Sequence, residues 1–364
     1  MVRRNDAHFM ERALKLADKG RGQTSPNPMV GAVVVRAGRI VGEGYHEGAG
    51  LPHAEVHALN QAGTKAKGAT LYVNLEPCCH AGRTPPCTKA ILTAGIERVV
   101  CAVEDPNPIV SGRGVQHLRG AGITVAVGCL EHEAERLNEI YFHYMRTGVP
   151  FVSLKIAQTL DGRIAASNGS SRWISGEASR RYGHVLRAQH DAVLVGAKTV
   201  VQDDPELTVR HVQGKNPIRI ILARTLGIPL DSRVVNDGGE GRTRVVTSVD
   251  GDPSTIEALQ SKGVGIWSLP LNEAGRFDLT ALLKKAAEED ITSLLVEGGC
   301  EVFSTFLRAR LVDKVYIFVA PTILGSGLPS IGDIGIGTLE NGLHLRDVEV
   351  RRSGQDVLMT GYLN

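Results

Sequence analysis

The segment from His53 to Cys87, HAEVHALNQAGTKAKGATLYVNLEPCCHAGRTPPC, contains the most informative pattern in this chain. It opens with His53-Ala54-Glu55, continues through Pro77-Cys78 and ends at Cys87. An imidazole and two thiolates supply three of the four tetrahedral ligands that Zn²⁺ prefers, and a catalytic zinc leaves the fourth position open for water. The segment therefore predicts a catalytic zinc site with His53, Cys78 and Cys87 as its ligands.

Glu55 follows the histidine by two residues, where a carboxylate can stay off the metal and carry protons. In zinc-dependent base deamination, such a glutamate moves a proton from the attacking water to a ring nitrogen and then to the departing amine. The usual signature is H-x-E with P-C-x-x-C, whereas here eight residues, 79–86, separate the two cysteines. We expect Glu55 to be the catalytic acid and base.

Two other interpretations of this segment are open. In the first, His53 caps a helix and the cysteines are small buried side chains, since free cysteine is among the most buried residue types. In the second, the zinc is structural and the chain binds a nucleotide without turnover. A closed structural site would need a fourth protein ligand, for which Cys79, His80 and His57 are near in sequence.

The charge balance argues against nucleic acid as a partner. The chain of 364 residues has 41 lysines and arginines against 39 aspartates and glutamates, and only 4% of its residues are aromatic. A nucleic-acid base deaminase needs a basic channel and stacking aromatic side chains. We therefore expect a small-molecule substrate.

The cysteines and the hydropathy pattern indicate the compartment. The six cysteines do not form a dense, evenly spaced disulfide framework, which favours a reducing cytoplasm. The first 20 residues alternate charges along an expected amphipathic helix rather than forming a signal peptide. Since no uncharged apolar run approaches the roughly 18–20 residues of a membrane span, we expect a soluble cytoplasmic protein without a membrane partner.

Strand and helix patterns alternate along both halves of the chain, which predicts α/β domains with helices on both faces of a sheet. In the first half, the expected elements are a hairpin over 30–35 and 38–41, helices over 53–63, 88–94 and 131–145, and strands over 69–75 and 98–103. In the second half, we expect strands over 151–156, 192–195, 218–222, 244–247, 293–296 and 314–319. The stop at Gly148-Val149-Pro150 places the domain boundary between them.

With His53-Ala54-Glu55, Leu75-Glu76-Pro77-Cys78 and Gly82-Arg83-Thr84-Pro85-Pro86-Cys87 in one chain, the first half resembles the deaminase of bacterial riboflavin biosynthesis. The second half resembles the reductase fused to it. The resemblance implies a cytidine-deaminase-like three-layer domain over 1–147 and a dihydrofolate-reductase-like α/β domain over 148–364. It also implies a bifunctional enzyme with Zn²⁺ and NADPH as cofactors, associated as dimers or tetramers.

The family implies two consecutive steps on one substrate. The first removes the 2-amino group of 2,5-diamino-6-(ribosylamino)pyrimidin-4-one 5′-phosphate. The second reduces its ribosyl group to a ribityl chain with NADPH. In the deaminase half, the family's pyrimidine contacts fall on four residues: Asn27, His46, His80 and Arg83. The alternatives are a turn residue before proline for Asn27 and a solvated loop for His80 and Arg83.

The second half lacks the usual dinucleotide fingerprint, because no G-x-G-x-x-G occurs in the chain. What remains is Glu297-Gly298-Gly299, between an apolar strand and a helix expected near Val302. Glycines at such a turn let a phosphate approach a helix N-terminus, although tight turns and helix ends produce the same pattern.

The resemblance assigns the reductase site residue by residue. The family's cofactor positions fall on Ala157, Trp173, Thr199, Asp203 and the turn from Gly299 onward. Its substrate positions fall on Lys155, Ser171, Arg187, Leu207, Arg210 and Glu297. Arg187 and Arg210 suit the 5′-phosphate, because a planar fork of donors matches phosphate oxygens. Core packing is the alternative for Trp173, a surface lysine beside a turn for Lys155, and exposed charges for the two arginines.

One position departs from the family. Ala223-Arg224 stands where the family commonly has Asp-Ser. Arg224 would either favour the 2′-phosphate of NADPH or have no effect on it.

Overall fold

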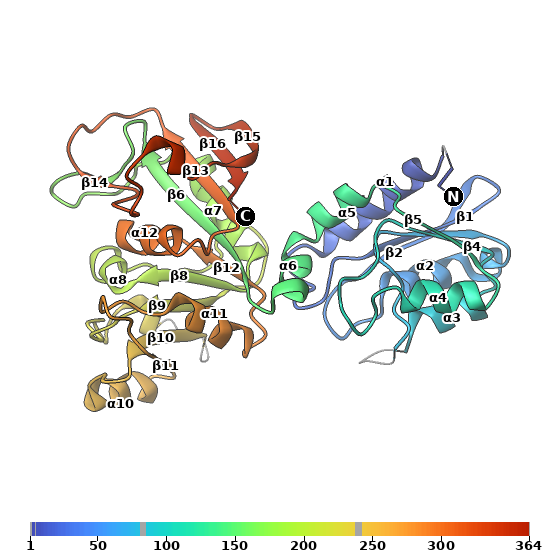
Figure 1. The fold of residues 1–364 in the computed structure, drawn as a ribbon, viewed down its shortest axis with the longest axis horizontal. Helices are drawn as coiled ribbons and strands as arrows, with labels where there is room; N and C mark the ends of the chain where they lie inside the picture. Colours follow the sequence, from blue (N-terminus) through green and yellow to red (C-terminus); the bar gives the residue numbers. More distant parts are fainter. Residues whose placement is uncertain (1, 4, 81–84, 237–241, 364) are drawn as a thin grey trace. The chain divides into compact units, whose positions relative to one another are not determined.

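The computed structural model describes residues 2–3, 5–80, 85–236 and 242–363. The chain forms two compact units, Met1–Gly148 and Val149–Asn364, each with its own sheet and its own hydrophobic clusters (Figure 1). None of the helices in the described ranges has the length and apolar character of a membrane span.

The sheet of the first unit has five strands in the order β2-β1-β3-β4-β5. Its strands are β1 (Gly31–Arg36), β2 (Arg39–Tyr45), β3 (Thr70–Val73), β4 (Arg98–Cys101) and β5 (Thr124–Val127). β1 and β2 form the predicted antiparallel hairpin, β3 runs antiparallel to β1, and β4 and β5 continue parallel to β3.

Helices cover both faces of this sheet, which confirms the predicted three layers (Figure 1). The helices are α1 (Asp6–Ala17), α2 (Ala54–Ala62), α3 (Cys87–Thr93), α4 (Arg113–Gly120), α5 (Glu131–Leu137) and α6 (Glu139–Thr147), with 3₁₀ turns η1 (Asp18–Gly20) and η2 (Gly63–Ala66). Ala32 and Val34 of β1 pack with α2, α3 and α4, whereas Val33 and Val35 pack with α1, α5 and α6. This alternation follows from the two-residue period of a strand.

The prediction of one continuous helix over 131–145 is wrong. The structure breaks it at Asn138, which leaves helical geometry with φ −103° and ψ 26° between α5 and α6. The side-chain amide of Asn138 pairs with the backbone of Met29, a partner 109 residues away in sequence. The helical periodicity of the segment cannot indicate such a partner.

A buried ion pair ties α1 to the sheet. Arg98 donates two hydrogen bonds to the carboxylate of Asp6, of 2.9 and 2.7 Å, and the Tyr72 hydroxyl donates a third of 2.9 Å. Burial alone would raise the pKa of Asp6, but the hydrogen bonds from Arg98, Arg3 and Tyr72 lower it to about 2. The carboxylate is therefore charged in the folded protein at neutral pH.

The large sheet of the second unit has nine strands in the order β11-β10-β9-β8-β12-β6-β13-β16-β15. The strands of this unit are β6 (Phe151–Thr159), β7 (Arg163–Ala165), β8 (Ala192–Gly196), β9 (Ile218–Leu222), β10 (Thr243–Ser248), β11 (Gly265–Leu269), β12 (Ser293–Val296), β13 (Lys314–Ala320), β14 (Leu328–Pro329), β15 (Arg346–Ser353) and β16 (Asp356–Tyr362). The strands from β11 to β13 are parallel, the β15–β16 hairpin is antiparallel, and β7 pairs with β14 in a small separate sheet.

Buried strands and covering helices make this unit the predicted α/β domain. Its helices are α7 (Glu177–Gln189), α8 (Ala197–Asp203), α9 (Arg233–Asn236), α10 (Pro253–Ser261), α11 (Leu279–Ala287) and α12 (Cys300–Arg308), with one 3₁₀ turn η3 (Leu339–Asn341). All of β12 is buried, with Leu294 and Val296 packed beside α11 and α12 and Leu295 packed beside α7. Parallel strands buried on both faces bring the loops that follow them to one edge of the sheet.

Candidate active sites

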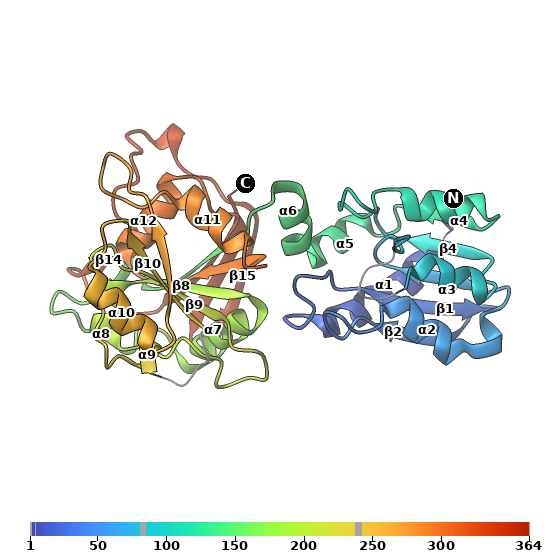
Figure 2. The same cartoon turned by 90° about the horizontal axis from the view of Figure 1, so that it is seen from below.

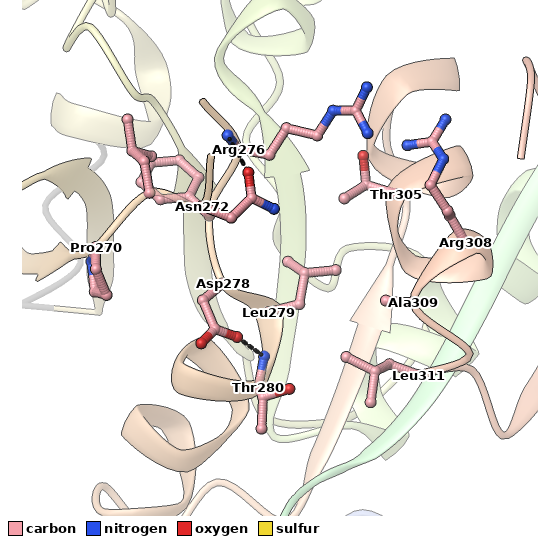
Figure 3. Close-up of a pocket in the computed structure, with 12 residues that line it drawn as sticks. Pro270, Asn272, Arg276, Asp278, Leu279, Thr280, Thr305, Arg308, Ala309 and Leu311 are labelled. Carbon is pink, nitrogen blue, oxygen red and sulfur yellow. Dashed lines mark hydrogen bonds between the residues drawn. The ribbon is translucent and has the colours of Figure 1, made fainter. Parts of the chain in front are cut away.

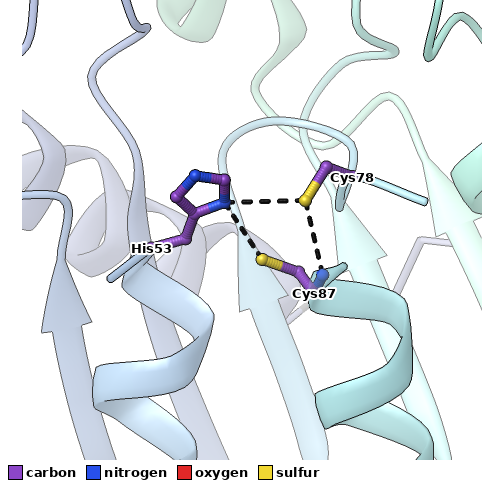
Figure 4. A group of neighbouring side chains, drawn as sticks. All are labelled: His53, Cys78 and Cys87. Carbon is purple, nitrogen blue, oxygen red and sulfur yellow. Dashed lines mark hydrogen bonds between the residues drawn. The ribbon is translucent and has the colours of Figure 1, made fainter. Parts of the chain in front are cut away.

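Three segments of the first unit bring the predicted zinc ligands together. His53 immediately precedes α2, Cys78 follows β3, and Cys87 begins α3, which lies beside α2 (Figure 2). The Nδ1 atom of His53 is 3.2 Å from the Cys87 sulfur and 3.5 Å from the Cys78 sulfur (Figure 4). All three ligand atoms lie within 4.8 Å of one another, as a shared metal ion requires.

The local electrostatics favour a metal ligand at Cys78. The Cys87 thiol, the His53 imidazole and the backbone N–H of Cys87 lower the pKa of Cys78 against the effect of burial. Zinc is bound by thiolates rather than thiols. Within the described residues, Cys79, His80 and His57 contribute no atom to the cluster, so it offers three protein ligands, the number that an open catalytic zinc site uses.

Glu55 lies beside this cluster in the first turn of α2. Its side chain is buried, at 3% exposure, and its Oε2 atom has no hydrogen-bond partner in the part of the chain that the structure describes. Burial, followed by the charge of Cys78, raises the pKa of Glu55 to about 7. A buried carboxylate oxygen without a protein partner is available to a water molecule or a substrate.

Two of the predicted pyrimidine contacts, Asn27 and His46, are hydrogen-bonded to each other beside His53. The Asn27 amide donates from Nδ2 to Nε2 of His46, over 3.1 Å, so that the proton of this imidazole is on Nδ1 and donates to the Pro52 carbonyl. Burial lowers the pKa of His46, which favours the neutral ring. The edge of the His46 ring also packs against the ring of His53, with 5.2 Å between centroids.

The loop between the cysteines is only partly described. His80 is half-buried, and none of the described residues forms a hydrogen bond with its Nδ1 atom. Arg83, the other predicted contact of this loop, lies outside the described residues.

Neither glycine of the predicted cofactor turn in the second unit accepts a side chain without strain. Gly298 and Gly299 connect β12 to α12, and a Cβ atom on Gly298 would lie 2.9 Å from Val195 and 3.1 Å from the Thr199 hydroxyl. Gly299 has φ +82°, which strains any residue with a side chain. Thr199 thus borders the turn, and the bare backbone at the start of α12 fits a phosphate of a dinucleotide.

Glu297 connects two other predicted residues. Arg187 of α7 donates to both carboxylate oxygens of Glu297, over 2.5 and 2.9 Å, and Lys155 of β6 lies 3.7 Å from Oε2. Burial would raise the pKa of Glu297, but Arg187 and Lys155 lower it to about 2. Arg187 is therefore paired with a buried carboxylate rather than being the exposed charge of the alternative interpretation.

Arg210 and Leu207 lie on the segment that follows α8. Arg210 is paired with Glu206 and also donates to the Thr208 hydroxyl over 3.1 Å. Leu207 is only 2% exposed, and its side chain packs in the cluster of Val193 and Val195.

The remaining predicted positions are Ser171, Asp203, Trp173 and Ala157. The Ser171 hydroxyl donates to Asp203 over 3.2 Å, so these two residues are neighbours. Trp173 is 71% exposed, with the Arg180 guanidinium 4.6 Å from its ring centroid, and core packing is therefore excluded for it. Ala157 lies on β6 and pairs with Phe318 of β13.

A cavity of about 450 Å³ lies between the start of α11 and α12, away from the predicted site residues (Figure 3). Arg276 and Arg308 line it, and none of the predicted residues does. Arg224, the residue that departs from the family, donates to the Gly275 carbonyl over 3.1 Å.

Comparisons with known proteins agree with both halves of this description. A family model of the RibD C-terminal domain matches residues 150–359, and a model of the zinc-binding region of cytidine and deoxycytidylate deaminases matches residues 3–103. The riboflavin biosynthesis protein RibD of Aquifex aeolicus is 51% identical, over 99% of both chains. The chain belongs to the RibD family of riboflavin biosynthesis proteins.

Other members of the RibD family extend the likeness. RibD of Escherichia coli is 42% identical over 97% of this chain and 98% of its own. Among solved structures, RibD of Acinetobacter baumannii has a TM-score of 0.90 at 37% identity, and a deaminase/reductase of Thermotoga maritima has 0.86 at 40%, each covering 99% of both chains. This chain is accordingly a bifunctional enzyme of riboflavin biosynthesis, a zinc-dependent deaminase and an NADPH-dependent reductase.

The sequence interpretation missed residues that support these RibD sites from a distance. Asn74 and Asn138 hold the backbone next to Asn27, and the His184 ring lies 3.0 Å from the Thr208 carbonyl and 3.3 Å from the backbone nitrogen of Arg210. Each of these residues contacts a partner on another element. A motif or a periodicity gives no signal for such contacts.

Proposed function

We propose that residues 1–147 deaminate 2,5-diamino-6-(ribosylamino)pyrimidin-4-one 5′-phosphate at its 2-amino group. Residues 148–364 then reduce the ribosyl group with NADPH, which gives 5-amino-6-ribitylaminouracil 5′-phosphate. The observation that carries this proposal is the cluster of His53, Cys78 and Cys87 with the Oε2 atom of Glu55 beside it, which has no hydrogen-bond partner among the described residues.

In the deaminase, His53, Cys78 and Cys87 hold the zinc ion, which when bound supplies Lewis-acid activation of water. Glu55 takes one proton from the attacking water and delivers it to a ring nitrogen, and it then carries the second proton of that water to the leaving amine. A carbon–oxygen bond forms at the ring carbon, the carbon–nitrogen bond to the amino group breaks, and ammonia leaves. Asn27, His46, His80 and Arg83 bind the ring edge and the phosphate.

In the reductase, NADPH when bound supplies a hydride to C1 of the opened ribosyl group. The turn from Gly299 onward and Thr199 hold its phosphates, with Ala157, Trp173 and Asp203 completing the cofactor contacts. Lys155, Ser171, Arg187, Leu207, Arg210 and Glu297 hold the substrate. Because Glu297 is ionised and paired with Arg187, it orients that guanidinium and does not serve as a proton donor.

Further properties belong to the same proposal. The small-molecule substrate excludes any need for a nucleic-acid or membrane partner, and the near-neutral charge and low aromatic content support this. We further propose that the chain is cytoplasmic, as its scattered cysteines favour, and that it forms homo-oligomers.

Ammonia release from the diaminopyrimidine ribosyl phosphate tests the proposal directly. Zinc-replete protein is incubated with and without NADPH, and the products are weighed by mass spectrometry. Ammonia in both samples, with a gain of two hydrogens only when NADPH is present, is the expected result. No ammonia in either sample would exclude this substrate for the zinc site.

A further inference from the structure

Two buried asparagines hold the backbone of Met29, just before β1. Asn138 accepts from the Met29 N–H over 2.8 Å and donates to the Met29 carbonyl over 2.9 Å. Asn74 donates to the same carbonyl over 3.0 Å and accepts from the Gly31 N–H over 2.8 Å. The exposures of Asn74 and Asn138 are 0% and 2%, so both amide side chains lie in the interior of the first unit.

The side-chain amide of Asn138 makes the two backbone hydrogen bonds to Met29 that a neighbouring strand would make inside a sheet. It satisfies both the donor and the acceptor of Met29, where the chain has not yet entered the sheet. The adjacent Pro28 has no N–H to contribute. Asn138 also stands at the break between α5 and α6, so the helix is interrupted at the residue whose amide makes these bonds.

Met29 is two residues from Asn27, whose side chain reaches the zinc site. The Asn27 amide donates to His46 over 3.1 Å, and the His46 ring packs edge-on against the ring of His53. The other end of this amide, its oxygen atom, is the acceptor that Asn27 would offer to the edge of a pyrimidine ring. Its direction depends on the backbone from residue 27 to residue 29.

We propose that Asn138 is a positioning residue of the deaminase, which acts on the substrate through Asn27. By fixing both polar groups of Met29, it holds the Asn27 amide in the orientation that binds the pyrimidine ring beside the zinc. This inference rests on the proposed function, and it assigns a role in the reaction to a residue outside the zinc motif and more than 100 positions from Asn27.

The side-chain chemistry favours asparagine at this place. Alanine removes both bonds to Met29, whereas aspartate keeps the acceptor oxygen but sets a second oxygen against the Met29 carbonyl. Asn74 still holds that carbonyl in either variant, so the segment is loosened rather than released.

Steady-state kinetics of ammonia release test the inference with Asn138→Ala, Asn27→Ala and the double variant. We expect N138A to raise the KM of the diaminopyrimidine by about tenfold while kcat changes by less than about threefold. The reason is that the substitution weakens binding of the ring but leaves the zinc ligands and Glu55 in place. If Asn138 acts through Asn27, N138A has no further effect on KM in the N27A background.

Matched controls separate positioning from general loss of stability. Tyr141→Phe removes another buried hydrogen bond of α6, the 2.9 Å bond from the Tyr141 hydroxyl to Asp105, without touching residues 27–31. It is expected to lower thermal stability and leave KM unchanged. Zinc content and reductase activity, measured on the same samples, verify that each variant chain is folded.

Three results would overturn the inference. These are an unchanged KM in N138A, KM effects of N27A and N138A that multiply in the double variant, and an equal rise of KM in Y141F. If N138A does not retain zinc, Asn138→Asp replaces it in the comparison of single and double variants. Loss of zinc in Asn138→Asp as well would make the role of Asn138 structural. Absence of ammonia from the wild-type protein would overturn the proposed function itself, and the inference with it.

Discussion

Arg187 and Glu297 form a two-bond ion pair, of 2.5 and 2.9 Å, between α7 and the turn that begins the predicted cofactor site. Lys155 lies 3.7 Å from the same carboxylate. Two cations thus share one buried anion, which leaves a net positive charge where the substrate phosphate is proposed to bind. Removing the anion would leave both cations buried and free to repel each other.

Glu297→Gln is therefore expected to damage the reductase alone. The amide keeps the shape of the side chain but loses the charge. Because breaking a buried ion pair costs about 3–5 kcal/mol, we expect reductase kcat/KM to fall by at least about tenfold. Deaminase kcat/KM should not change. Glu288→Gln is the matched control, because its 2.8 Å pair with Lys285 is exposed and contributes little. Equal losses in the two variants would contradict the assignment.

Glu55→Gln is expected to abolish deamination while zinc content stays at the wild-type level. Glutamine has the size of glutamate but cannot carry a proton, and general acid–base catalysis typically contributes about 10²–10⁴ in rate. Ammonia release and metal analysis on the same protein check this. Turnover at the wild-type rate would exclude the mechanism assigned to Glu55.

Asp6→Asn is expected to destabilise the first unit in a pH-dependent way. The pKa of Asp6 is lowered from 3.8 to about 2 on folding, so its charged form stabilises the protein fully above pH 4, and this contribution disappears as the pH falls toward 2. From that shift we expect a loss of about 2 kcal/mol at pH 7, with the difference between the variant and the wild type shrinking below pH 4.

Urea unfolding followed by circular dichroism measures this difference. Tryptophan fluorescence is the internal control, because both tryptophans, Trp173 and Trp267, lie in the second unit. A fluorescence transition that shifts as much as the dichroism would show that the effect is not confined to the first unit.

Asp203→Asn tests whether this carboxyl supplies the proton in the reductase step. Asp203 accepts from Ser171, and both are proposed site residues. A proton donor contributes about 10²–10⁴ in rate, so a loss in this range is expected in single-turnover oxidation of NADPH. Asp204→Asn is the neighbouring control, since Asp204 binds the backbone of Arg233. An unchanged hydride-transfer rate in D203N would discard this role.

The sequence predicted best what depends on short spacings and on strand periodicity. The strands over 218–222 and 293–296 have the expected bounds, and the His53, Cys78 and Cys87 side chains lie together as their spacing predicts. The reductase residues came from the resemblance instead, because Lys155, Arg187 and Glu297 belong to three distant segments.

Contacts between distant segments account for what was missed. The break at Asn138 depends on Met29, and no local pattern marks it. The hairpin of β15 and β16 was not predicted, because all but the last residue of β15 are exposed and the strand therefore shows no alternation of buried and exposed positions.

The separate hydrophobic clusters of the two units have a consequence for the cell's supply of enzyme. Because both units are parts of one polypeptide, every round of translation delivers one deaminase site and one reductase site. The ratio of the two catalysts is thus set by the covalent chain and does not drift with expression level. A cell that makes more of this protein raises the capacity of both steps together. Higher expression therefore does not increase deaminase capacity without an equal increase in reductase capacity.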